Sequence, residues 1–253
     1  MSRRVPGPRA VAITYRVLVS QLLTRGRVVA LAMIGAAVML LGWVVGNVDR
    51  SDVAPADRAE EQLEAGVGLI SLVGFTALVP VVALVFAAAS LGDTREDGTL
   101  VYLWLRPMPR WAIAVGAWLA ALTVALPLTV GPITATAVLL DAGGDLVAAA
   151  VLSSAVAVIA YSGVFVLLGL LVKNAIVWGL AYVLLWEGIV AAFGSAAARV
   201  AIRGYASSIL TDRTGVSLDL GDVSQTTAVV VTLAIAVATL TLATARLQRL
   251  EVA

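Results

Sequence analysis

The sequence contains neither cysteine nor histidine, and lysine occurs once, at Lys173. These absences exclude disulfides, thiol nucleophiles, histidine-based zinc sites and Ser-His or Cys-His catalytic relays. The chain also lacks a GxxxxGK[ST] phosphate-binding motif and any polar block large enough to form a soluble core. We therefore expect no catalytic site, cofactor or metal on this chain, and any energy source other than an ion gradient must lie on another chain.

Charge is also scarce. Only 13% of the 253 residues are charged, 61% are hydrophobic, and the mean hydropathy is +1.01. A soluble domain is roughly 45–50% apolar and about 25% charged, so most of this chain is expected to lie in a lipid bilayer. A net charge of +1 gives no reason to expect a nucleic-acid partner.

Apolar runs long enough to cross a bilayer recur along the chain and predict an all-α protein with six transmembrane helices. The first run is too long for the hydrophobic region of a signal peptide and is expected to be retained. The third run contains Pro127, Gly131 and Pro132, which predict a kink or a span that projects beyond the membrane, and Pro80 predicts a milder bend in the second. The predicted spans are 28–46, 67–92, 111–140, 146–172, 175–197 and 226–245.

Residues 9–27 precede the first span and have the pattern of an amphipathic interfacial helix. Arginines fall on one stripe at helical spacing, whereas Leu18, Leu22 and other apolar residues fall on the opposite face. Such a helix lies at the headgroup level with its cations toward anionic lipid. The alternative is a basic flank that only orients the protein.

Arginine and lysine are distributed unevenly between the two sides of the predicted spans. With the N-terminus inside, twelve of the 17 cationic residues lie on the inner side, and five lie on the outer side, namely Arg50, Arg58, Arg199, Arg203 and Arg213. Cytoplasmic loops of membrane proteins carry the excess of Arg and Lys. Both termini and the loop 93–110 are therefore predicted to be cytoplasmic, and the Ala-, Val- and Arg-rich composition indicates a bacterial plasma membrane.

Two features on the outer side and within the spans leave alternatives open. The outer segment 198–225 is either a short interfacial or re-entrant helix or a solvated loop. Glu187 is an ionisable residue within the predicted fifth span, where a carboxylate costs roughly 2.5–3.5 kcal/mol. It lines a substrate or proton route, pairs with a polar group on a neighbouring helix, or lies near the outer interface.

The loop 93–110 separates two of the longest apolar runs. Its first part is polar, its middle is apolar with Tyr102 and Trp104, and Arg106-Pro107 stops any helix. A short amphipathic helix in such a loop exposes apolar surface to a partner. The alternative is that it lies back on the inner leaflet.

The residue order of this loop resembles the signature of type-2 ABC exporter permeases. EDGTL at 96–100 is followed by a short apolar run and by LRPMPR at 105–110. In that family Glu-x-Gly-Thr-Leu follows the second span and a Pro-x-x-Arg turn opens the third. The basic N-terminal helix, six spans and cytoplasmic termini agree with the family, and Trp186-Glu187 is similar to its small bacterial members. The specific motif is confined to 96–110, whereas the layout covers most of the chain.

The resemblance implies a function and partners. In such permeases the loop after the second span is a coupling helix that docks on a separate cytoplasmic ATPase, which holds ATP and Mg, and two permease chains form the pathway. The resemblance assigns the coupling role to eight residues of this loop, namely Glu96, Gly98, Thr99, Leu100, Tyr102, Trp104, Pro107 and Arg110. The apolar spans fit an amphipathic or lipid-like substrate.

Two other functions are weighed against this one. A membrane anchor for a cytoplasmic ATPase would use the same loop without moving a substrate. An ion-coupled secondary carrier usually shows inverted repeats and several intramembrane charges, whereas this sequence shows one such Glu and no visible repeat.

Overall fold

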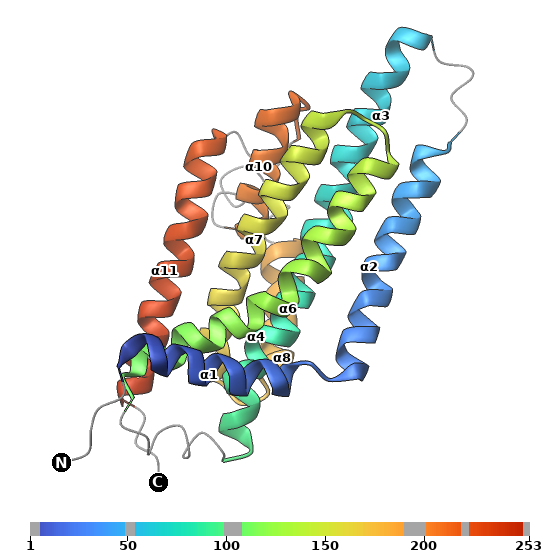
Figure 1. The fold of residues 1–253 in the computed structure, drawn as a ribbon. Helices are drawn as coiled ribbons and strands as arrows, with labels where there is room; N and C mark the ends of the chain where they lie inside the picture. The colour runs from blue at the N-terminus through green and yellow to red at the C-terminus, as the bar shows by residue number, and fades with distance from the viewer. Residues whose placement is uncertain (1–5, 49–53, 99–107, 190–200, 219–222, 250–253) are drawn as a thin grey trace, which may run out of the picture.

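A computed structural model describes residues 6–48, 54–98, 108–189, 201–218 and 223–249. Every regular element in these ranges is a helix (Figure 1). The elements are α1 (Gly7–Leu22), α2 (Arg25–Gly46), α3 (Pro55–Leu69), η1 (Ile70–Leu78), α4 (Val79–Glu96), α6 (Arg110–Leu139), α7 (Gly144–Leu171), α8 (Ala175–Tyr182), η2 (Val183–Ile189), α10 (Ile202–Thr214) and α11 (Gln225–Arg249).

Five helical segments are long and apolar enough to cross a membrane: α2, the continuous helix over 57–96, α6, α7 and α11. They coincide with five of the six predicted spans, so the chain has the architecture of a helical membrane protein. The predicted fifth span, 175–197, is described only as far as η2, and its last residues lie outside the described ranges. The count of six therefore stays a prediction.

Proline affects the two longest helices differently. α6 continues through Pro127 and Pro132 as one helix of 30 residues, which is about 45 Å long and exceeds a hydrocarbon core of about 30 Å. In the 57–96 helix, the π-helical turns of η1 end next to Pro80, at the start of α4. Proline has no N–H and its ring clashes with the carbonyl four residues earlier, and wider turns relieve both problems.

A helix forms where the interfacial helix is predicted, but with shorter bounds. α1 lies across one end of the bundle and packs along α6 (Figure 1). It buries one stripe of residues, Ala10, Thr14, Leu18 and Leu22, while Arg9 and Arg16 are exposed. The expected extension to residue 27 is wrong, because the helix ends at Leu22 and a new helix, α2, begins at Arg25.

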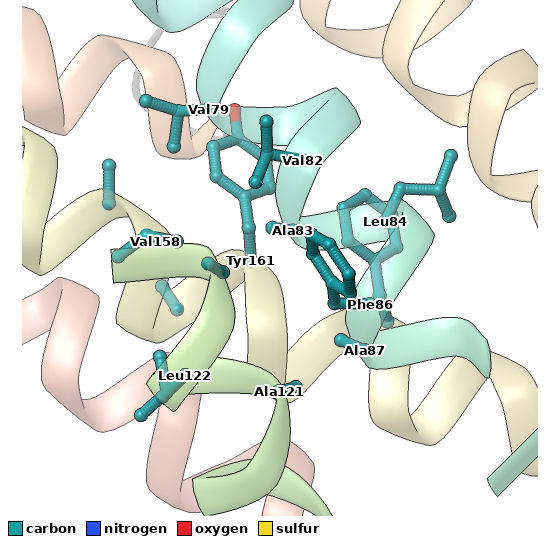
Figure 2. Close-up of a cluster of buried hydrophobic side chains, with 14 of the residues drawn as sticks. Val79, Val82, Ala83, Leu84, Phe86, Ala87, Ala121, Leu122, Val158 and Tyr161 are labelled. Carbon is teal, nitrogen blue, oxygen red and sulfur yellow. The ribbon is translucent and has the colours of Figure 1, made fainter. Parts of the chain in front are cut away.

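α7 is the centre of the bundle and packs against α4, α6, α10 and α11. Figure 2 shows side chains of α4, α6 and α7 meeting there, with alanines such as Ala83 and Ala121 between larger residues. Small residues let membrane helices approach closely, since van der Waals contact drives their association. At Gly169 of α7, an added Cβ would lie 2.6 Å from the carbonyl oxygen of Ala88 in α4.

α10 is neither a solvated loop nor a full span. Eight of its residues are buried, among them Arg203, one of the cations predicted on the outer side. Its last turn is joined to the start of α11, where the Gln225 N–H donates to the Asp212 carboxylate at 2.8 Å. The described part of 198–225 thus contains a short helix inserted into one half of the bundle.

The close approach of α4 and α7 can be tested by a substitution that adds one methyl group at the contact. We expect Gly169→Ala to destabilise the protein by about 1–3 kcal/mol, because the Cβ overlaps backbone that cannot rotate away. Thermal unfolding in detergent measures the change. The matched control is Gly68→Ala, where nothing lies within 4 Å of the added Cβ; equal melting temperatures for the two variants would contradict the packing described here.

Candidate functional site

Glu187 lies in η2, and its side chain is fully buried. Three groups donate hydrogen bonds to its carboxylate. The Tyr182 hydroxyl and the Ile202 N–H each lie 3.1 Å from Oε1, and the Arg203 N–H lies 3.2 Å from Oε2. The Arg203 guanidinium also lies 3.5 Å from the backbone carbonyl oxygen of Glu187.

The local sequence of α10 explains why a carboxylate is needed there. The first N–H groups of a helix have no partner within the helix and carry partial positive charge. The N-cap residue is Ala201, whose methyl side chain cannot accept a hydrogen bond. Glu187 therefore caps α10 from a separate helical segment.

In this geometry Glu187 pairs with polar groups of a neighbouring helix, which is one of the three roles considered for it. An N–H in the apolar interior costs several kcal/mol when it has no acceptor. The carboxylate supplies acceptors to two such groups at once. Because these donors belong to a separate helix, the helical pattern of 175–197 does not identify them.

Aromatic rings and serine hydroxyls surround this cap. Phe165 stacks on Tyr161 with centroids 5.9 Å apart and meets the ring of Tyr182 edge-on at 6.1 Å. On another side of α10, the Ser207 and Ser71 hydroxyls form a buried hydrogen bond of 2.9 Å. Since Ser71 lies in η1, both π-helical segments hold the same short helix, and π-helical turns often occur at functional sites.

A second polar region lies where α4 ends, at the predicted coupling loop. The Glu96 carboxylate accepts a hydrogen bond of 2.7 Å from the N–H of Asn174 in the turn between α7 and α8. Arg95 donates to the carbonyl oxygen of Leu170 at 3.0 Å. Asp93 pairs with Arg27 at the start of α2, at 2.9 Å. The end of α4 is thus bonded to α2 and to both arms of the α7–α8 hairpin.

The structure describes only part of the predicted coupling set. Glu96 ends α4, Gly98 follows in a left-handed conformation (φ +68°), and Arg110 begins α6. Gly98 suits its position because a residue without a Cβ adopts positive φ without strain. The remaining predicted residues, Thr99, Leu100, Tyr102, Trp104 and Pro107, lie outside the described residues.

Sequence reasoning missed the partners of this loop. Asp93 and Arg95 lie inside the predicted loop but had no assigned role, and Arg27 was assigned only to the N-terminal basic helix. Asn174 had one available signal, because Lys173-Asn174 is a polar break between two apolar runs, and Asn tolerates the left-handed backbone (φ +54°) found there.

No protein-family model matches this chain, and no curated protein matches it significantly. Its function is therefore inferred from the residues and contacts described above.

Replacing Glu187 tests its role as a cap. Glu187→Leu leaves two backbone N–H groups and a tyrosine hydroxyl without an acceptor, at about 1–3 kcal/mol for each unsatisfied group. Glu187→Gln keeps one oxygen acceptor, so it is expected to destabilise the protein less than Glu187→Leu does. Thermal unfolding in nanodiscs gives the ranking, and proteolysis at 201–218 reports whether α10 is released. A Leu variant as stable as the native chain would refute the capping role.

Proposed function

We propose that this chain is the membrane-spanning permease subunit of an ATP-driven ABC exporter. Two permease chains, identical or different, work with two copies of a cytoplasmic ATPase in the plasma membrane of a bacterium. Both termini lie in the cytoplasm. The transported substrate is amphipathic or lipid-like and moves out of the cell.

The observation that carries this proposal is the bonding of the end of α4. The Glu96 contact with Asn174 and the Arg95 contact with Leu170 join the coupling segment to the α7–α8 hairpin. The Arg27–Asp93 pair, with both side chains partly exposed, joins it to α2. A force applied to residues 96–110 by ATPase closure therefore acts on three helices at once, which is what a coupling element requires.

The same helix reaches the capped site. α4 continues through η1 as one helix over 57–96, and Ser71 of η1 bonds to Ser207 of α10. A helix transmits axial displacement, and π-helical turns are points where it deforms. In the proposed mechanism, movement of α4 shifts η1 against α10, whose N-terminus is held by Glu187. Glu187 then acts on the pathway by positioning α10.

The outer faces of the bundle fit the partners that this function needs. Only 22% of the apolar window of α2, and the same share for α11, is buried within the chain. Large apolar side chains are exposed along α2, α8 and α11, including Trp43, Trp178 and Val237. Such faces contact lipid or a second permease chain.

Topology and docking are testable with single cysteines because the chain has none of its own. Asp97 and Asp145 are both exposed acidic residues at helix ends. Asp97 precedes α6 and Asp145 follows it, so one membrane-length helix separates them. In intact cells, a membrane-impermeant maleimide is expected to label Asp145→Cys and to spare Asp97→Cys. In inverted vesicles the pattern should reverse, and the ATPase of the proposed complex should protect Asp97→Cys alone.

Labelling of Asp97→Cys from outside intact cells would overturn the proposed orientation. Equal labelling with and without the ATPase would overturn docking at this loop. Proteoliposomes that hold the complex but show no ATP-dependent flux would favour a membrane anchor, and flux driven by an ion gradient without ATP would favour a secondary carrier.

Coupling itself is testable at Glu96. Glu96→Ala removes the acceptor for the Asn174 N–H, so we expect the ATPase to bind while ATP-dependent transport falls roughly tenfold, as for a lost charged hydrogen bond. The matched control is Glu60→Ala, since the exposed Glu60 side chain lies in α3, outside the coupling segment, and bonds to no residue that the structure describes. Transport that is unchanged in the Glu96 variant would show that this contact does not couple the two subunits.

A further inference from the structure

A slot opens between α7 and α11 at the end of the bundle that carries Glu96. Its volume is about 280 Å³, and its lining residues are Leu167, Leu171, Leu242, Ala245, Arg246 and Arg249. Leu171 ends α7, and the preceding residue, Leu170, accepts the hydrogen bond from Arg95. The slot is therefore at the same membrane face as the coupling segment.

The two walls of the slot differ in polarity: the α7 wall is apolar, and the α11 wall is apolar in part and cationic in part. Leu167 and Leu171 are four residues apart on α7, so they lie on one face. Leu242, Arg246 and Arg249 are spaced by four and three residues on α11 and also share a face. The α7 wall is therefore leucine throughout, whereas the α11 wall changes from Leu242 to two guanidinium groups toward the end of α11.

These guanidinium groups have no partner in the part of the chain that the structure describes. The Nε atom of Arg246 is buried and makes no hydrogen bond. No ion pair joins Arg246 or Arg249 to a described acidic residue. Arg246 is half-buried and Arg249 is exposed, so both guanidinium groups are available to an anion from outside the chain, which would form charge-assisted hydrogen bonds with them.

We propose that this slot binds one anionic phospholipid of the cytoplasmic leaflet. An acyl chain lies along Leu167, Leu171 and Leu242, and the phosphate accepts hydrogen bonds from Arg246 and Arg249. Basic pockets between membrane helices on the cytoplasmic side bind anionic headgroups, and arginine presents several donors to one phosphate. The binding does not require the ATPase, so it stands or falls separately from the proposed transport function.

The test is native mass spectrometry of the purified full chain, titrated in detergent with phosphatidylglycerol or phosphatidylcholine. We expect one phosphatidylglycerol to be retained in preference to phosphatidylcholine, and the double variant Arg246→Gln/Arg249→Gln to reduce its affinity roughly tenfold or more. The matched control is Lys173→Gln/Arg213→Gln, which also removes two exposed cations, neither of which lines the slot, and should leave the affinity unchanged.

A second pair of variants tests the apolar wall without changing charge. Leu242→Trp fills the slot and should also weaken lipid retention, whereas Leu233→Trp alters an exposed position of α11 outside the slot and should not. Gel filtration and the Asp97→Cys labelling pattern establish that each variant is folded and correctly oriented.

Three results would overturn the proposal. They are equal retention of both lipids by the native chain, equal retention of phosphatidylglycerol by the double variant and the native chain, and displacement of the lipid by millimolar inorganic phosphate. The last result would show that the arginines bind free phosphate and that the leucine wall contributes nothing.

Discussion

The constraint on which this structure depends is that backbone polar groups inside an apolar bundle must find partners without water. Long helices satisfy it internally, but α10 begins within the bundle and leaves its first N–H groups without acceptors. The Glu187 carboxylate accepts hydrogen bonds from two of them. Burying a lone carboxylate costs free energy, and so does burying helix N–H groups without acceptors. Each group here offsets the cost of the other. Removing either the carboxylate or the short helix would leave the other without its partner.

The bundle around this cap is assembled by close approach of small residues. α7 contacts α4 at Gly169 and α11 at Gly163, where an added Cβ would lie 2.6 Å from the Thr239 hydroxyl oxygen. α2 meets α6 through Gly35 and Gly42. These contacts use small residues and no charged ones, and charged side chains other than Glu187 collect toward the ends of helices. The Glu96 junction and the arginines of the α7–α11 slot are both found there.

The amphipathic pattern and the hydropathy predicted much of the fold. Five predicted spans coincide with membrane-length helices, and α1 buries the face that lacks arginine. The boundary at Leu22 was not foreseen, since no Gly or Pro marks it. The inserted helix α10 was one of two alternatives, because its mixed apolar and polar residues fit a buried helix and a surface loop alike. Of the coupling residues, the motif indicated Glu96 but not the Asn174 N–H that binds it.

Composition and short-range periodicity are local properties, and they determined by themselves that this chain is helical and apolar enough for a membrane. They also determined which segments carry its charges, because composition and periodicity can be read from neighbouring residues alone. Tertiary structure alone decided which polar groups bond between segments far apart in the sequence. Glu96 and Asn174 are 78 residues apart, and Arg27 and Asp93 are 66 apart. Partners at such separations are selected by how helices pack, and that packing is a property of the whole bundle rather than of any one segment.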